Sequence, residues 1–415
     1  MDTDTAHACR RWPTEDGRHT PYRVFTDPDV YTREQERIFR GKTWSFVALE
    51  AEIPNVGDFK STYVGDTPVV VTRGKEGVLH AWVNRCAHRG AKVCRQARGN
   101  ARDFTCIYHQ WAYGPAGDLL GVPFRRGLKS MSGMPADFDM GGHGLQKLRV
   151  ETYRGLVFVT FSDETEPLET YLGAEMLPWI DRVFCKPVVF LGVLRQRMNS
   201  NWKLYFENIK DPYHGHLLHL FHNTFNIGRP NMDVANAIDA RHGLHSIIAA
   251  IKNEASKDTS IYKDNRVTTF KDDVRLQDPE IVRMRTEFDL PVTNHIQSIF
   301  PSLVIQQIHN TLACRQILPR GPGSFELVFH LFGYEDDDDE LRDMRILQAN
   351  LVGPAGFISM EDGEATELVQ AAVTPDPNHE STMLMGYGAP EGARSLITEQ
   401  LLRSFWSGYR AIMGD

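Results

Sequence analysis

The sequence predicts an α+β protein in which a small all-β domain precedes a larger domain of mixed helices and strands. Up to about Phe161, short β-rich runs such as PVVVT (68–72) and GLVFVTF (155–161) alternate with Gly, Asp and Pro turns. Beyond residue 166, helical and strand patterns mix without an internal repeat or a low-complexity linker. We therefore expect an N-terminal helical segment at 1–44 that packs on the larger domain, the β domain at 45–165 and the larger domain at 166–415.

The expected elements follow from local patterns along the chain. TREQERIF (32–39) starts with a Thr and has a capping-box pattern, which predicts a helix. The acidic run EDDDDE (335–340) lies between two strand candidates, so we expect a solvated loop there. In the larger domain, apolar spacing and β-branched runs predict helices at 167–184, 203–222 and 394–413, and strands at 187–198, 298–318, 325–334 and 344–352.

Composition narrows the class of protein. Lys and Arg number 46 against 54 Asp and Glu, and a net charge of −8 argues against a nucleic-acid-binding surface. No apolar run approaches the roughly 20 residues that cross a bilayer, so we expect no membrane association. Met1–Arg10 has no apolar signal-peptide region, and six cysteines are too few for a disulfide scaffold in 415 residues. These features favour a cytoplasmic enzyme whose clustered thiols hold metal.

Two short motifs in the β domain each pair a cysteine with a histidine. NRCAHRG supplies Cys86 and His88, and CIYHQW supplies Cys106 and His109. Two Cys and two His suit either a tetrahedral zinc ion or a [2Fe–2S] cluster with two imidazole ligands. The mixed Cys–His pair in each motif favours the cluster, because zinc fingers keep Cys with Cys and His with His.

CAHRG and CIYHQWAYGPAGDLLGVP resemble the Rieske domain in the large subunit of aromatic-ring-hydroxylating oxygenases. The resemblance implies a Rieske [2Fe–2S] cluster held by Cys86, His88, Cys106 and His109. A Rieske domain by itself only carries electrons, so a second metal motif is expected downstream. The family also implies a helix-grip catalytic domain, an antiparallel sheet with helices, for residues 166–415.

A second group of metal-ligating residues lies in NWKLYFENIKDPYHGHLLHLFH (201–222), with four His in nine residues. Non-haem Fe(II) oxygenases bind iron with two His and one carboxylate. In a regular helix, positions 216 and 219 or 219 and 222 share a face, whereas 214 and 219 lie about 140° apart. The pair 214 and 219 requires a distorted helix, for which Pro212 or a π-bulge are candidates.

ENIKDPYHGHLLH is similar to a motif of the same oxygenases, and the resemblance selects among these pairs. It implies that His214 and His219 are iron ligands, and that Asp211 bridges to a Rieske His of a neighbouring subunit. GPAGFISMEDGE (353–364) resembles the family's late segment and implies Asp362 as the third ligand. Glu361 and Glu364 are the competing candidates for the third ligand. His216 and His222 are expected in the outer sphere of the metal or at the surface.

The resemblance also implies partners and an assembly. Electrons come from a ferredoxin and/or an NAD(P)H reductase, and O2 is the co-substrate. Transfer between subunits implies a head-to-tail ring, which closes as a trimer. Either a homotrimer or an α3β3 assembly with a small β subunit is expected.

The resemblance is nearest to large subunits that act on aromatic carboxylates, and a carboxylate in an apolar pocket needs an Arg. Arg315 in the apolar pattern TLACRQILP is the candidate, with a salt-bridged strand Arg as the equal alternative. Where terephthalate-type enzymes have a second Arg, this chain has Leu396, with Arg394 displaced by two residues, which favours a monocarboxylate. The other expected substrate contacts are Asn208, Leu218, Gln306 and Phe357.

The main expectation is an oxygenase that hydroxylates salicylate at position 5 to give gentisate. The alternative in the same class is cis-dihydroxylation by an anthranilate or terephthalate dioxygenase. A rival class is a Rieske electron-transfer protein with a ligand-binding domain, and a third is a zinc-stabilised binding protein.

Overall fold

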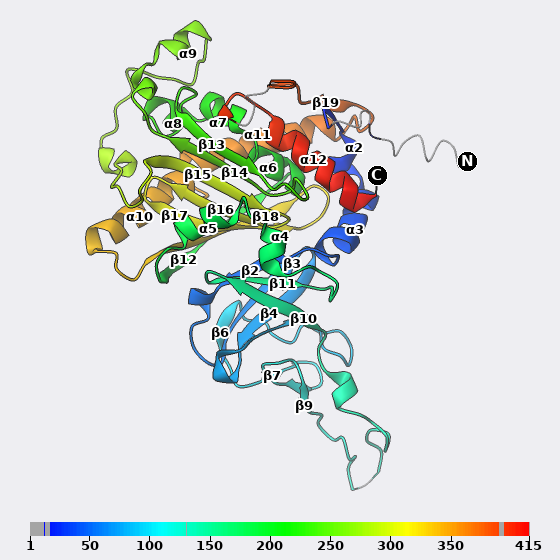
Figure 1. The fold of residues 1–415 in the computed structure, drawn as a ribbon. Helices are drawn as coiled ribbons and strands as arrows, with labels where there is room; N and C mark the ends of the chain where they lie inside the picture. The colour runs from blue at the N-terminus through cyan, green and yellow to red at the C-terminus, as the bar shows by residue number, and fades with distance from the viewer. Residues whose placement is uncertain (1–11, 13–16, 130, 390–393, 415) are drawn as a thin grey trace, which may run out of the picture. The chain divides into compact units, whose positions relative to one another are not determined.

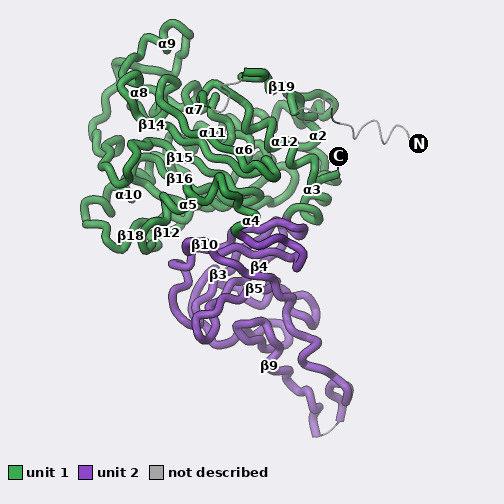
Figure 2. Tube along the Cα trace, viewed as in Figure 1, with its two compact units in different colours: residues 1–38, 169–415 green, residues 39–168 purple. Residues whose placement is uncertain are grey.

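The computed structural model describes residue 12 and residues 17–129, 131–389 and 394–414 (Figure 1). Met1–Arg10, on which the signal-peptide expectation rests, lie outside the described residues. The chain divides into two compact units, one of residues 39–168 and one of residues 1–38 with 169–415 (Figure 2). The α+β class is therefore confirmed, with a smaller unit of strands and a larger unit of helices and strands.

The smaller unit contains a seven-stranded antiparallel sheet and a three-stranded sheet. Its core contains the buried aromatic residues Phe59, Trp82, Phe104, Trp111 and Tyr113, which hold the two sheets together. The large sheet has the order β2-β11-β10-β5-β4-β3-β6, with β2 Ser45–Leu49, β3 Asp58–Val64, β4 Thr67–Arg73, β5 Leu79–Val83, β6 Arg98–Asn100, β10 Lys147–Tyr153 and β11 Leu156–Thr160. The small sheet is β7 Phe104–Thr105, β8 Ala112–Tyr113 and β9 Leu119–Gly121.

The larger unit is built on a seven-stranded antiparallel sheet of order β12-β18-β17-β16-β15-β14-β13 (Figure 1). Its strands are β12 Val188–Met198, β13 Asp233–Ile238, β14 Ser246–Ile251, β15 Val292–Ile299, β16 Leu303–Ile308, β17 Thr311–Pro319 and β18 Phe325–Tyr334. A two-stranded sheet pairs β1 His19–Pro21 with β19 Glu380–Thr382.

Helices cover both faces of the large sheet. Alternate residues of β15 face opposite ways, so that Asn294 and Ile296 line a cavity under one set of helices while the ring of His295 meets that of Trp179. The helices are α2 Arg23–Thr26, α3 Pro28–Glu34, α4 Leu168–Leu172, α5 Leu177–Val183, α6 Trp202–Asn208, α7 Pro212–Leu218, α8 Leu220–Thr224, α9 Ser260–Asp264, α10 Asp339–Val352, α11 Phe357–Val373 and α12 Gln400–Met413. No described helix is both long and apolar enough to span a bilayer.

One expected strand, 344–352, is wrong, because this segment belongs to α10. The apolar run ILQANLV suggests a strand, but the helix begins earlier, within the acidic run. The side chain of Asp338 accepts a hydrogen bond from the amide of Leu341 at 2.8 Å and caps the helix N-terminus. Capping and the following helix-forming residues therefore outweigh the local β pattern.

Several expected boundaries also shift. The helix expected at 32–39 is α3, which begins at Pro28 after its cap Asp27, and a π-helical turn follows at Gln35–Phe39. Gly173, with φ of 84°, separates α4 from α5 within the expected helix 167–184. The expected helix 203–222 is three helices, the expected strand 298–318 comprises the end of β15 with β16 and β17, and α12 begins at Gln400.

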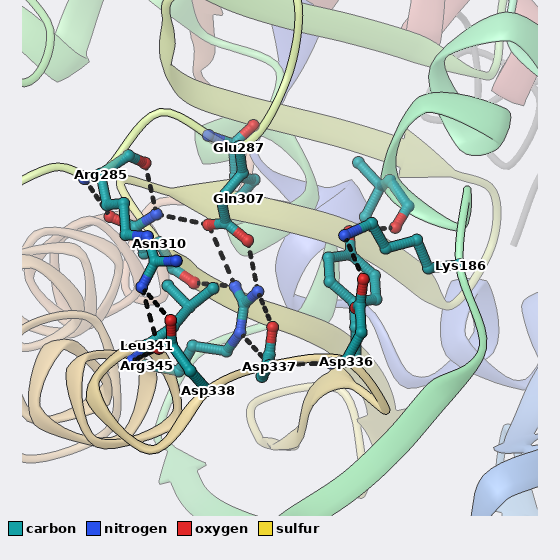
Figure 3. A network of polar contacts seen from close by, with 12 residues as sticks. Lys186, Arg285, Glu287, Gln307, Asn310, Asp336, Asp337, Asp338, Leu341 and Arg345 are labelled. Carbon is teal, nitrogen blue, oxygen red and sulfur yellow. Dashed lines mark hydrogen bonds and ion pairs between the residues drawn. The ribbon is translucent and has the colours of Figure 1, made fainter.

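The acidic run is only partly solvated. Asp336 is exposed and pairs with Lys186, but Asp337 is buried and accepts bonds from Nε and Nη2 of Arg345 at 2.7 and 2.8 Å (Figure 3). Glu287 pairs with the same guanidinium. Removing one partner of such a buried pair costs about 3–5 kcal/mol, so the run has a structural role that its composition does not indicate.

His245 is a buried, neutral imidazole whose two nitrogens are both paired. Its Nε2 donates to the carbonyl of Tyr171 at 2.8 Å, and its Nδ1 accepts from the amide of Phe300 at 3.0 Å. Burial lowers the pKa of His245 to about 4, although the carboxylate of Asp239 opposes this shift. Protonation at Nδ1 would remove the acceptor that Phe300 requires.

We expect this residue to make the larger unit acid-sensitive. Between pH 6.5 and about 4 the unfolded chain binds a proton at His245 that the folded chain does not, so the free energy of unfolding falls with falling pH by about 1.4 kcal/mol per unit. His245→Gln, which retains a donor and an acceptor, should show a smaller loss of melting temperature from pH 6.5 to 4.5 than the wild type. His242→Gln, at an exposed position, is the control, and equal slopes for all three proteins would contradict the assignment.

Candidate metal centres

The two Cys–His motifs form two loops of the same construction in the smaller unit. The amide of Cys86 donates to the carbonyl of Ala91 at 2.8 Å, and the amide of Gly90 donates to the carbonyl of Cys86 at 2.9 Å. In the second loop the amides of Cys106 and Gln110 donate to Trp111 and Cys106, both at 2.9 Å. Gly90 and Gln110 have φ of 74° and 57°, the left-handed conformation that turns each loop back on its cysteine.

The loops place the sulfur atoms inside and the imidazoles outside. Cys86 and Cys106 are buried, whereas His88 is exposed and its ring centroid lies 4.5 Å from that of His109. The ring of His88 stacks on Trp111 at 4.8 Å. The hydroxyl of Tyr113 lies 3.2 Å from Sγ of Cys86, where it can donate to a thiolate. This asymmetry suits a cluster with sulfur-bound and nitrogen-bound irons at different depths.

A single zinc ion would require the four ligand atoms of the Cys–His quartet to converge closely. Bonds of about 2.0–2.3 Å around zinc keep all four ligand atoms within about 4 Å of one another. Among the described residues, the group placed to hold a single metal ion is instead His214, His219 and Asp362, whose ligand atoms lie within 4.8 Å of one another. The Cys–His quartet therefore fits a binuclear cluster better than a zinc ion.

His214, His219 and Asp362 converge in the larger unit. The Nε2 atoms of His214 and His219 lie 3.4 and 3.3 Å from Oδ1 of Asp362. Non-haem Fe(II) prefers a donor set of two imidazole nitrogens and one carboxylate oxygen on one face, with the opposite coordination positions open. Asp362 comes from α11, about 140 residues after the two histidines.

A break in the helix brings the two histidines together. His219 has φ of −82° and ψ of 107°, which is extended backbone, and it ends α7 and precedes α8. The expectation of a distortion at Pro212 or at a π-bulge is wrong, because Pro212 is the first residue of α7. The chain instead leaves the helix at His219 itself.

The outer ring nitrogens of both histidines have partners. Nδ1 of His214 lies 2.6 Å from the carbonyl of Asp211, and Nδ1 of His219 lies 2.7 Å from Oε2 of Glu361. Because both partners are acceptors, each Nδ1 carries a hydrogen and each Nε2 faces the site, where it is available to a metal. Glu361, expected as a competing ligand, thus supports His219, and Glu364 is exposed.

The charges of this site balance one another. Burial lowers the pKa of His219, but the carboxylates of Asp362 and Glu361 raise it to about 9 overall. Burial also raises the pKa of Asp362, but the two imidazoles hold it well below its usual range. A divalent cation bound at Nε2 of both histidines would meet a carboxylate that is already ionised, so the residues present fit the metal that the donor set indicates.

Asp211 lies beside this site. Its Oδ1 accepts from the amide of Tyr213 at 2.8 Å as the cap of α7, and its Oδ2 lies 3.7 Å from Nδ1 of His214. The side chain is 18% exposed, so it touches His214 and also reaches solvent. Burial raises the pKa of Asp211, which the neighbouring His214 opposes.

A cavity adjoins the His–His–Asp site, with about 600 Å³ of empty space including the part open to solvent, and is lined by α6–α8, α11 and the face of β14–β17. Arg315, only 3% exposed, lies in its wall. Its Nε donates to Oε1 of Gln306 at 2.6 Å, and its Nη1 donates to the hydroxyl of Tyr205 at 2.7 Å. Among the described residues no carboxylate pairs with Arg315, so the alternative of a salt-bridged strand Arg is wrong.

The other expected substrate residues are only partly at the cavity. Asn208 lines it and donates to Oδ1 of Asp362 at 3.0 Å. Gln306 is fully buried and orients Arg315, while Leu218 does not line the cavity and Phe357 is 51% exposed. His216 and His222, expected at the outer sphere or surface, are buried and line the cavity.

The expectation missed several residues of the cavity wall. The alternation of side chains along β15 indicates that Asn294 and Ile296 lie on the same face of the sheet. It does not indicate which face borders the cavity, because that depends on tertiary packing. Leu396, at the position compared with a second Arg, is buried and lines the cavity, whereas Arg394 is exposed. The other missed residues are Ile209, Gly215, Gly228, Ile248, Ala250 and Ile308.

An iron–sulfur domain and a site for mononuclear iron on one chain are the construction of the Rieske-type oxygenases. A family model described as the Rieske [2Fe-2S] domain matches residues 43–132, and one described as the ring hydroxylating alpha subunit catalytic domain matches residues 186–415. The chain belongs to this family of oxidoreductases. Its cofactors are a Rieske [2Fe–2S] cluster and mononuclear non-haem iron.

Within the family, the chain is similar to three large subunits along nearly its whole length. It is 62% identical to the anthranilate 1,2-dioxygenase large subunit of Burkholderia cepacia over 97% of this chain and 95% of the relative. It is 42% identical to a terephthalate 1,2-dioxygenase alpha subunit of a Comamonas species, covering 98% of both chains. It is 41% identical to the salicylate 5-hydroxylase large component of a Ralstonia species, covering 98% of this chain and 96% of the relative.

A solved structure shares the fold. The naphthalene 1,2-dioxygenase from a Rhodococcus species, with indole bound, matches with a TM-score of 0.77 at 24% identity. The match covers 95% of this chain and 94% of that chain. At this identity, the likeness establishes the fold alone.

Replacing Asp362 tests whether the converging residues hold the mononuclear iron. We expect Asp362→Ala to lower the iron content from about three to about two atoms per chain, because the cluster retains two. Acid-labile sulfide and the visible cluster absorption should remain unchanged. Glu364→Ala, two residues away and exposed, is the matched control and should keep all the iron; loss of iron in that variant instead would reverse the ligand assignment.

Proposed function

We propose that the chain is the large subunit of a multicomponent oxygenase whose substrate is anthranilate, 2-aminobenzoate, and which dihydroxylates ring carbons 1 and 2. Identity of 62% over 97% of the chain to an anthranilate 1,2-dioxygenase supports this substrate. The main expectation from the sequence was salicylate, but the salicylate 5-hydroxylase component is 41% identical. The alternative expectation, anthranilate, therefore replaces it.

The buried guanidinium of Arg315 is the observation that carries the proposal of a carboxylate substrate. A buried cation without a carboxylate partner is costly, and a substrate carboxylate in the cavity would supply that partner. Gln306 and Tyr205 are neutral, so they orient the guanidinium without neutralising it. The carboxylate group of the substrate would be the counter-ion of Arg315, in place of a protein carboxylate.

The cavity has one cation for one carboxylate. Arg315 is the only Lys or Arg among the described residues that line it, and Leu396 occupies the wall where the comparison with terephthalate-type enzymes places a second Arg. An apolar side chain there leaves a second carboxylate without a partner. This supports a monocarboxylate over terephthalate.

The residues have separate roles in this proposal. Cys86, His88, Cys106 and His109 hold the cluster, which supplies electrons one at a time when bound. His214, His219 and Asp362 would hold the mononuclear iron, which would supply the chemistry of O2 activation. Asp211, in contact with His214, links the imidazole to a Rieske histidine of a neighbouring subunit in a trimer, and the electrons come from a ferredoxin or reductase. We include a small β subunit among the proposed partners, because membership of the family does not by itself specify them.

Product analysis tests the substrate. Dihydroxylation at carbons 1 and 2 of anthranilate gives a diol that regains aromaticity by losing carbon dioxide and ammonia, leaving catechol. With ¹⁸O2, a suitable reductase and anthranilate, we expect catechol with both oxygen atoms labelled and one ammonia per catechol. Gentisate from salicylate with one labelled atom, and no catechol from anthranilate, would instead support the salicylate expectation.

Arg315 variants test the carboxylate contact. Loss of a charge-assisted bond costs about 1.5–3 kcal/mol, so Arg315→Gln should raise the Kd for anthranilate by about 10–100-fold. Arg315→Lys retains the charge without the bidentate fork and should lie between this variant and the wild type. Arg195→Gln, on the surface of β12, is the control with unchanged affinity. Equal Kd values in all four proteins, measured anaerobically by equilibrium dialysis, would exclude this role.

A further inference from the structure

Besides the two ring nitrogens of His216, two buried polar groups in the cavity wall have no partner among the described residues. One is Oδ1 of Asn294 on β15, and the other is Nε2 of His222 on α8. Both residues line the cavity that contains Arg315. An unmade hydrogen bond at a buried group is unfavourable, so groups of this kind indicate where a ligand completes the wall.

The hydrogen-bond role of His222 follows from its other nitrogen. Nδ1 lies 3.2 Å from the carbonyl of Gly215, which can only accept, so Nδ1 carries the hydrogen. Nε2 is therefore a bare acceptor. The carbonyl oxygen of the Asn294 amide is also an acceptor, and the unpaired groups thus require hydrogen-bond donors.

The two side chains both approach Gly228. A Cβ at this glycine would lie 3.2 Å from Nδ1 of His222 and 3.8 Å from Nδ2 of Asn294. The His222 ring centroid also lies 4.6 Å from that of His219. Both side chains therefore come close to Gly228, and the ring of His222 lies near the iron site.

We propose that Asn294 and His222 form the specificity-determining contact for the amino group of a 2-aminobenzoate. This inference rests on the proposed function and extends it to the ring substituent. The amino group has two N–H donors, one for each acceptor, while the carboxylate of the same ring pairs with Arg315. The carbon that bears the amino group then lies beside the iron site, where it is to be hydroxylated.

A hydroxyl group fits this pair less well. Salicylate has a single O–H, which cannot serve both acceptors and which its own carboxylate also attracts. At least one buried acceptor stays unpaired, and the lone pairs of the hydroxyl oxygen face those of the protein. Benzoate has no donor at this position, so it measures the Arg315 contact alone.

Binding constants of the oxidised, iron-loaded protein, measured without reductase or O2, test the inference. In the wild type we expect anthranilate to bind at least ten-fold more tightly than salicylate. Asn294→Leu removes the acceptor with little change in volume and should reduce the ratio of the two Kd values about ten-fold, with the Kd for benzoate changed less than two-fold. Asn294→Asp keeps an acceptor. Its negative charge should weaken the binding of all three acids, but the preference for anthranilate over salicylate should be retained.

Ile308→Val is the matched control in the cavity wall, because it trims an apolar contact and should leave the ratio of the Kd values unchanged. Retained cluster absorption and benzoate binding show that each variant is folded. An unchanged ratio in Asn294→Leu, with a wild type that still forms catechol, overturns this inference and leaves the proposed function standing. Failure of the wild type to form catechol from anthranilate overturns the proposed function itself.

Discussion

The chemistry of the larger unit depends on the extended backbone of His219. Were α7 to continue, His214 and His219 would lie about 140° apart around one helix, and no single ion could bind both. The break turns His219 back, and Glu361 and Asp362, adjacent on α11, then meet it from two sides: one holds the outer nitrogen and the other faces the inner one. One backbone conformation thus determines the ligand geometry, the tautomer and the charge balance.

The cavity follows from the same arrangement. The helices that carry the His–His–Asp site lie over the face of β14–β17, so the iron site and the sheet side chains face the same cavity. The sheet contributes the cation, and the helices contribute the metal ligands and His222. Helices and strands therefore supply most of the cavity wall.

Much of the site was predictable because its signal is local. Cys86 and His88, or Cys106 and His109, are near neighbours on short loops, and their spacing carries the chemistry. A distortion between His214 and His219 was expected, but its place at His219 was not predictable, because the local sequence resembles an amphipathic helix and the extended conformation depends on packing against α11. The same dependence on packing explains why Phe357 was wrongly expected at the substrate. The rotation of α11 about its axis directs Ile358, and not Phe357, to the cavity. Gln306 was predicted to be at the substrate, but its partner is Arg315 on the adjacent strand, which only the register reveals.

The neutral hydrogen-bond partners of Arg315 affect how well hydrocarbons without an acid group can bind. A guanidinium held by Gln306 and Tyr205 cannot swing to a surface acid, so its charge remains in the cavity whichever ring enters. An arene without an acid group would strip water from that charge and return no counter-ion, a desolvation penalty that its own apolar area does not offset. On the proposed function, we therefore expect benzene-like molecules to bind this cavity more weakly than aromatic acids of similar size.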